Sequence, residues 1–184
     1  SGTVSSQSGI LGIAAGGSSN NGFWDSTGGL LVLQGDFTFD GTTTLTGTSL
    51  QQYANGQFTV NGPFTCSSGL DLSGLADFSV QPSQVASFSG ALWLSPYGTD
   101  IPTITGGGTV DANGGMQILG GVIDGTTVNL GAASTASHTG TGALTLTNTG
   151  IFNNAGTYQA SGDGSITQTA TPGNLFQNSG TFTR

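Results

Sequence analysis

Residues 152–158 read FNNAGTY, and further along the chain residues 176–182 read FQNSGTF. In both stretches an aromatic residue, an asparagine, a glycine, a threonine and a second aromatic residue hold the same places. Self-similarity at a fixed period of about 20–50 residues is the signature of a repeat architecture. This recurrence therefore predicts that the chain folds as a stack of similar units.

A second series of repeats is formed by Thr-x-Thr triplets. They occupy residues 103–105, 145–147 and 167–169, and residues 124–126 (DGT, as at 40–42) fall near the position where the series is interrupted. Residues at i and i+2 of a strand point to the same side. We therefore expect the threonines to face outward and the residue between them to face inward, in a repeat of about 21–24 residues; Ile104 and Leu146 fit this pattern, and Gln168 does not.

Composition indicates which kind of unit is stacked. The chain has 34 glycines, no lysine and no glutamate, and 5% of its residues are charged, against roughly 25% in an ordinary soluble domain. Thr, Val, Ile and Phe favour strands, whereas Gly, Asn, Asp and Ser favour turns. We predict an all-β fold, a parallel β-helix (solenoid) with about 20–24 residues per coil. An antiparallel β-sandwich is the alternative, because it also contains short strands at regular spacing.

The chain divides into two parts at this stage. Residues 1–27 are rich in glycine and serine and are expected to form an N-terminal cap or a first irregular coil, and residues 28–184 are expected to form the solenoid coils. Residues 82–102 carry three prolines and Trp93, and they indicate a loop excursion from the solenoid wall.

The two aromatic–Asn–Gly–Thr stretches give the chain a resemblance to a known group of proteins. It resembles the right-handed parallel β-helix repeat regions of bacterial surface adhesins, of the filamentous-haemagglutinin and autotransporter-passenger types, over residues 106–184. The resemblance implies a right-handed coil, secretion to the cell surface, a fibrous or stalk-like form, and work in binding or scaffolding. It carries no catalytic residues onto this chain.

Charge and hydropathy exclude several classes of partner. The formal net charge is −8, and the single basic side chain is Arg184. A single arginine cannot neutralise the many phosphates of a nucleic acid, so we expect no nucleic-acid partner. No run of about 18 apolar residues is present, so no membrane insertion is expected.

The sequence shows no convincing catalytic or cofactor site, and we expect no enzyme activity. Cys66 and His138 each occur once, so they cannot supply a tetrahedral zinc site, and a lone cysteine is most often a small buried apolar residue. Asp111, in GGTVD, and Asp163, in SGDG, are the nearest approaches to the calcium motif of β-rolls. Neither match is complete, so no cofactor is expected and calcium has only these two weak candidates.

Two groups of residues are candidates for binding. Trp93 and Tyr97 flank Pro96 and offer aromatic faces for sugar rings, or else they cover an end of the solenoid. The second group is Thr103, Thr105, Thr145 and Thr147, whose regular spacing resembles the face of ice-binding solenoids.

Taken together, these features predict a non-catalytic, extracellular structural or adhesive β-helix segment of a surface protein or fibre. Its expected partners are protein surfaces, glycans or further copies of itself in a fibre. A carbohydrate- or ice-binding solenoid is the alternative. A polysaccharide lyase or hydrolase is the third hypothesis, for which Asp36 with Asp40 and Asp71 with Asp77 are the carboxylate pairs.

Overall fold

The computed structural model describes residues 2–48, 50–52, 56–170 and 172–184, with the backbone alone for residues 50–52. These residues form 26 β-strands and no helix. The strands belong to three sheets, which we call walls A, B and C. None of the described segments is a helix long and apolar enough to cross a membrane.

The three walls share the strands in strict rotation. Wall A contains β1 (Thr3–Ser5), β4 (Phe23–Ser26), β7 (Thr43–Gly47), β10 (Phe64–Cys66), β13 (Val85–Phe88), β16 (Thr109–Ala112), β19 (Thr127–Leu130), β22 (Ile151–Asn154) and β25 (Leu175–Asn178). Wall B contains β2 (Ile10–Ile13), β5 (Leu30–Leu33), β8 (Leu50–Gln52), β11 (Leu70–Ser73), β14 (Leu92–Ser95), β17 (Met116–Ile118), β20 (Thr135–His138), β23 (Thr157–Ala160) and β26 (Thr181–Thr183). Wall C contains β3 (Gly17–Asn20), β6 (Phe37–Asp40), β9 (Gln57–Val60), β12 (Asp77–Val80), β15 (Thr103–Thr105), β18 (Gly121–Asp124), β21 (Leu144–Thr147) and β24 (Ile166–Gln168).

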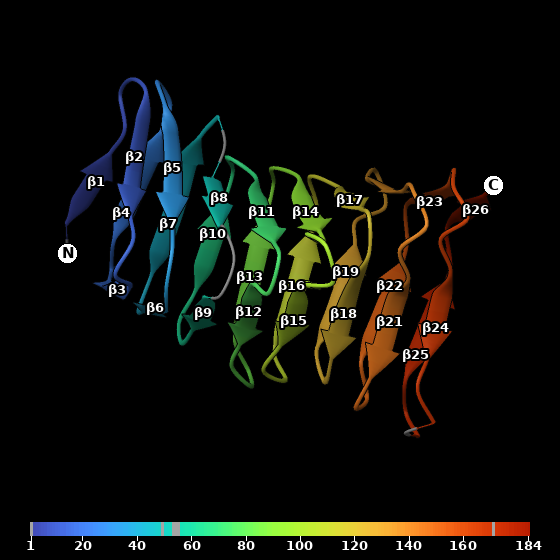
Figure 1. Cartoon of the computed structure of the whole chain (residues 1–184). Helices are drawn as coiled ribbons and strands as arrows, with labels where there is room; N and C mark the ends of the chain where they lie inside the picture. The colour runs from blue at the N-terminus through green and yellow to red at the C-terminus, as the bar shows by residue number, and fades with distance from the viewer. Residues whose placement is uncertain (1, 49, 53–55, 171) are drawn as a thin grey trace.

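Each strand pairs with the strand three places further along the chain, so that three strands make one coil (Figure 1). Every pairing between these strands is parallel. The parallel β-solenoid predicted from the sequence is therefore confirmed, with about eight coils, and the antiparallel sandwich is wrong. The termini lie at opposite ends of the stack (Figure 1).

The repeat that opens the sequence marks one coil of this stack. Phe152 is in register with Phe176, and Tyr158 with Phe182. The ring centroids are 5.5 and 5.3 Å apart, with interplanar angles of 8° and 6°. The offset between the two stretches thus places like residues directly above one another, at the spacing of neighbouring strands.

Alternation along each strand fills the interior. In the middle coils most inward side chains are apolar and buried, and a continuous core runs from Trp24 in the second coil to Tyr158 in the eighth. Aromatic rings form its central part, where Phe64, Phe78 and Phe88 pack with centroids 5.6–5.8 Å apart. This burial, together with unbroken main-chain pairing along the walls, is the main source of stability.

Glycine allows the chain to turn at the corners. In both DGT stretches the glycine that follows a wall C strand has a positive φ, 65° at Gly41 and 63° at Gly125. Residues with a β-carbon disfavour this left-handed conformation, whereas glycine adopts it freely. Each aspartate–glycine pair therefore ends a strand and redirects the chain toward the next wall.

The coils differ in length. A short coil runs from Thr109 to its partner Thr127, and a longer one runs from Asp77 to its partner Thr103. Residues 1–27, expected as a cap or an irregular coil, contain β1, β2, β3 and β4. Residues 82–102, expected as an excursion, contain β13, β14 and a connection over 96–102 that lengthens its coil.

Candidate functional site

The threonines singled out in the sequence lie together on wall C. Thr103 and Thr105 belong to β15, and Thr145 and Thr147 to β21, with β18 between them. Their neighbours on the strands, Ile104 and Leu146, are completely buried, so the threonines occupy the outer face. The gap in the series is filled by Val122 and Asp124 of β18.

Hydroxyl pairs extend this series toward the C-terminus. The Oγ1 atoms of Thr145 and Thr167 are 3.0 Å apart, and Thr169 donates a hydrogen bond from Oγ1 to Thr147 Oγ1 at 3.1 Å. We call these four residues the threonine quartet. Thr105 is engaged differently, because its hydroxyl donates to Asp77 Oδ1 at 2.8 Å.

Wall A carries a ladder of amides on its outer face. Asn153 donates from Nδ2 to Asn129 Oδ1 at 2.9 Å, and Asn129 donates from Nδ2 to Asp111 Oδ1 at 2.8 Å. The three residues lie in register on β22, β19 and β16. Asp111, one of the two calcium candidates, thus accepts a side-chain hydrogen bond within this ladder.

The other calcium candidate, Asp163, lies on the surface, where one of its oxygens is 4.0 Å from a guanidinium nitrogen of Arg184. In the described parts of the chain, no three His, Cys, Asp or Glu side chains gather at one place. Calcium at either aspartate stays a prediction.

Trp93 is an exposed aromatic residue in the middle of wall B. It lies in register with Asp71 of β11 on one side and Gln117 of β17 on the other. Neighbouring strands are about 4.8 Å apart, so a carboxylate, an indole and an amide follow one another up the wall. Trp93 is 45% exposed and Tyr97 is 77% exposed. The interpretation that they cover an end of the solenoid is wrong, since β14 lies in its middle.

The carboxyl group beside Trp93 is partly buried. Burial raises the pKa of Asp71, and a hydrogen bond from the Ser95 side chain opposes that rise. Its Oδ1 is inaccessible to solvent and has no hydrogen-bond partner among the residues that the structure describes. One oxygen of the carboxylate beside the indole is therefore shielded from solvent.

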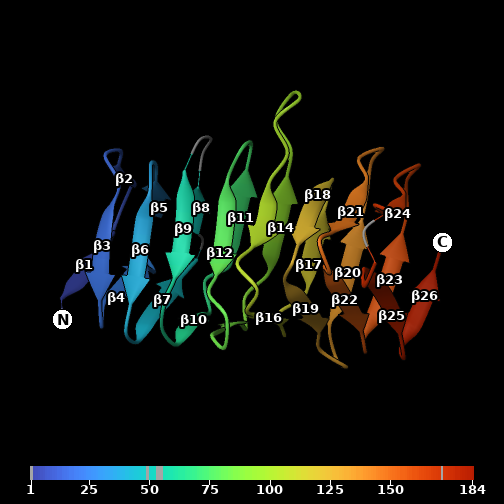
Figure 2. The ribbon, with the colours of Figure 1, turned by 90° about the horizontal axis from the view of Figure 1, so that it is seen from below.

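The connection after β14 forms a hairpin that rises beyond the corners of the neighbouring coils (Figure 2). Two main-chain hydrogen bonds of 3.0 Å, Tyr97 N to Asp100 O and Asp100 N to Tyr97 O, close it. Gly98 at its tip has a φ of 62°. The hairpin is therefore a tight turn that holds the Tyr97 ring away from the wall.

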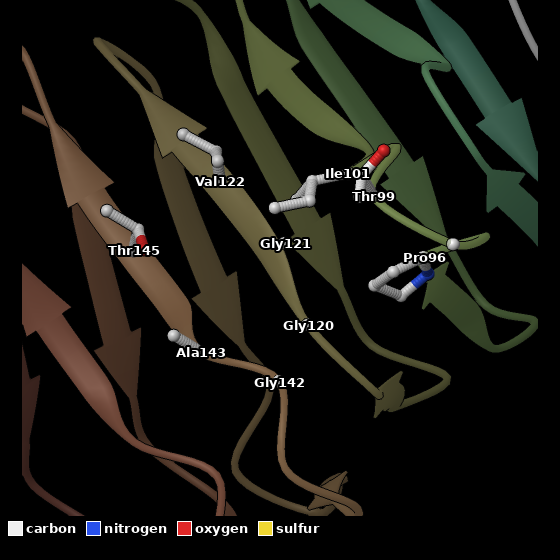
Figure 3. Close-up of a pocket in the computed structure, with 10 residues that line it drawn as sticks. Pro96, Thr99, Ile101, Gly120, Gly121, Val122, Gly142, Ala143 and Thr145 are labelled. Atoms are coloured by element: carbon white, nitrogen blue, oxygen red, sulfur yellow. The ribbon is translucent and has the colours of Figure 1, made fainter.

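A cavity of about 200 Å³ lies between this hairpin and the corners of the next two coils. We call it the corner groove (Figure 3). Pro96, Gly98, Thr99 and Ile101 form the hairpin side, and residues 120–122, 142, 143 and 145 form the other side. Most of its lining is apolar, with threonine hydroxyls at both sides.

Small residues keep the corner groove open. A β-carbon added to Gly120 would lie 3.0 Å from Pro96 Cγ, and one added to Gly142 would lie 2.0 Å from the Leu119 carbonyl oxygen. Gly142 is also held from inside the solenoid. Its carbonyl accepts a hydrogen bond from His138 Nε2 at 2.8 Å, while His138 Nδ1 pairs with the Tyr158 hydroxyl at 2.6 Å.

The sequence did not predict how several residues of this region are brought together. Residues 70–73 read LDLS and residues 92–95 read LWLS, a recurrence that would have placed Asp71 beside Trp93. The buried His138, which is 2% exposed, has no comparable signal. The prediction that Cys66 is a small buried residue is confirmed, and its burial raises the pKa of the thiol.

No protein-family model, no curated protein and no solved structure matches this chain.

Proposed function

We propose that this chain is a non-catalytic structural and adhesive segment of a surface protein or fibre, of the adhesin type that its repeats resemble. The observation that carries the proposal is the continuity of the three parallel walls around one core. Each coil contacts only its neighbours, so the stack behaves as a rod about 40 Å long at about 4.8 Å per coil. A rod of this kind is suited to presenting surfaces at a distance.

The outer faces support an adhesive role rather than a purely mechanical one. They present hydroxyls, amides and a few exposed rings, with nine aspartates and one arginine in the whole chain. Such faces form hydrogen bonds and ring contacts with proteins or glycans without strong charge selection. We place this activity outside the cell, where the lack of lysine and of internal arginine removes sites for trypsin-like proteases.

The test combines binding with turnover. Beads coated with the chain are passed over immobilised proteins and polysaccharides, and the same polysaccharides are assayed in solution for new reducing ends or unsaturated products. We expect retention of the beads and no product. Catalytic release of sugar that disappears in the Asp36→Asn or Asp71→Asn variant would replace this proposal with the enzyme hypothesis.

Ice binding is a second candidate, and the threonine quartet is the observation that favours it. Its hydroxyls repeat about every 4.8 Å along the stack and about every 6.6 Å along a strand, which makes a small regular array. Thr147→Lys should abolish any thermal hysteresis, whereas Thr65→Lys on wall A should leave it unchanged. Equal effects of the two substitutions, or no hysteresis in the unmodified chain, would eliminate this candidate.

A further inference from the structure

We infer that Trp93 and the corner groove together bind a neutral oligosaccharide. This inference deepens the proposed adhesive function and rests on it, because it names the class of molecule held at one place on the rod. The site spans the outer face of wall B and the adjoining corner, where the hairpin over residues 96–102 leaves the stack.

Trp93 supplies a platform for one sugar ring. Its indole is 45% exposed on a wall whose neighbouring positions in the same column, Asp71 and Gln117, are polar. A pyranose ring has an apolar C–H face and a rim of hydroxyls. The C–H face packs on the electron-rich indole face, while the amide of Gln117 on the adjacent coil bonds hydroxyls at the rim.

The corner groove supplies the second contact. Pro96 follows Trp93 by three residues of nearly extended chain, a distance of about 10 Å. A single sugar ring on the indole does not reach the groove, so the ligand is an oligosaccharide. Ile101, which is 46% exposed, offers an apolar surface to the next ring, and the hydroxyls of Thr99 and Thr145 offer hydrogen bonds.

Charge selects a neutral ligand over an acidic one. Asp71 lies beside the platform and Asp100 lies in the hairpin. The only arginine, Arg184, is beside Asp163 near the C-terminal end of the stack. Uronic or sulfated sugars would thus meet carboxylates without a compensating cation.

The same surface is poorly suited to a protein partner. A stable protein interface buries about 1,000 Å² or more around an apolar centre. Here Trp93 has polar neighbours along its column, with Asp71 on one side and Gln117 and then Ser137 on the other. The exposed apolar side chains of the hairpin and the next coil are Tyr97, Ile101 and Leu119. One ring flanked by a carboxylate and an amide matches the size of a sugar rather than that of a protein surface.

The experiment uses the full chain with neutral hexasaccharides of β-1,4-glucose, β-1,3-glucose, α-1,4-glucose and β-1,4-mannose, and with hexagalacturonate as the acidic probe. Binding is measured by titration calorimetry and by tryptophan fluorescence, in which the buried Trp24, 7% exposed, serves as an internal reference. We expect at least one neutral hexasaccharide to bind and hexagalacturonate not to bind. Trp93→Ala should weaken binding about tenfold, the value of one ring contact.

Two further variants separate the site from a general surface effect. Ala143→Phe fills the corner groove and should weaken binding, with circular dichroism confirming that the variant is folded. Phe23→Ala removes a ring that is 42% exposed on wall A, and it should leave binding unchanged. Because Phe23 and Trp93 are similarly exposed on different walls, this pair is the matched control.

The inference is overturned if no neutral hexasaccharide binds at up to about 10 mM, which corresponds to less than about 3 kcal/mol of binding free energy. It is also overturned if hexagalacturonate binds equally well, if Phe23→Ala matches Trp93→Ala, or if only proteins are captured at this surface. Should the coated beads adhere while every hexasaccharide fails, the proposed adhesive function stands and this site is rejected.

Discussion

Replacing Phe78 by alanine should divide the solenoid in its middle. Phe78 lies on β12, is completely buried, and has Phe64 and Phe88 with ring centroids 5.6 Å away on either side. It is also in register with Phe58 and Ile104 of the neighbouring coils. Truncation therefore removes contacts both within its coil and between coils.

The expected loss of unfolding free energy is about 3–5 kcal/mol, the usual cost of a Phe→Ala cavity in a packed core. A typical domain has about 5–15 kcal/mol in total, so this one substitution removes a large share. Stability in a solenoid is a sum over coils and their interfaces. Weakening one central interface should therefore let the two halves unfold separately.

Urea unfolding followed by circular dichroism measures the loss, and hydrogen exchange shows which coils open. The matched control is Phe182→Ala at the last strand, where the ring is 48% exposed and stacks on Tyr158 alone among the buried residues. We expect that control to cost about 1 kcal/mol. If both substitutions cost the same, or if the Phe78 variant still unfolds in one transition with unchanged midpoint, the coil-by-coil account of stability is refuted.

Three further predictions concern the corners, the carboxylates and the amide ladder. Gly156→Ala places a β-carbon 2.2 Å from the Ser134 carbonyl oxygen, so it should lower the free energy of unfolding by about 1–3 kcal/mol. Gly12→Ala, with open space around its β-carbon, should leave the free energy of unfolding unchanged, and thermal melting compares the two variants. Hydrogen bonds from Thr27 lower the pKa of Asp25, so the ionised Asp25 side chain stabilises the fold above the ordinary carboxyl pKa, and this stabilisation is lost as the pH falls through the lowered value. Burial raises the pKa of Asp71, so the ionised Asp71 side chain destabilises the fold most at neutral pH, and this destabilisation is relieved as the pH falls. At neutral pH the melting temperature should therefore be lower than that of the unmodified chain for Asp25→Asn and higher for Asp71→Asn. A change of the same sign in both variants would contradict these assignments. Asn129→Ala removes two side-chain hydrogen bonds and should cost about 1–3 kcal/mol, measured by urea unfolding; a loss within error of zero would show that the ladder adds nothing to stability.

Much of the fold was predictable because it depends on local patterns. Alternation along a strand fixes which side chains face in, so the outward threonines of β15 and β21 could be assigned from their spacing. The aromatic repeat predicted the coil offset near the C-terminus correctly, as the pairing of Phe152 with Phe176 shows. The first hundred residues lack so clear a repeat, and there the sequence supported only a general expectation of coils.

The candidate site was predictable only in part. Trp93 and Tyr97 were identified, but their exposure in the middle of the stack was not. The corner groove escaped prediction because it depends on a hairpin packing near glycines of two later coils. His138 was considered as a zinc ligand that lacks partners, and the structure places it inside the solenoid, paired with Tyr158 one coil further on.

The sequence by itself determined the all-β class, the coil period near the C-terminus and the outward side of the threonine strands, since these follow from a two-residue alternation and a recurring period; the structure decided between parallel and antiparallel pairing. The tertiary structure alone decided which outward residues become neighbours. The coil from Thr109 to Thr127 is shorter than the coil from Asp77 to Thr103, so the offset between adjacent walls changes from coil to coil. The recurrence of LDLS as LWLS already indicates that Asp71 lies beside Trp93, whereas the meeting of Trp93 with Gln117 is a consequence of how these unequal coils satisfy main-chain pairing and core packing.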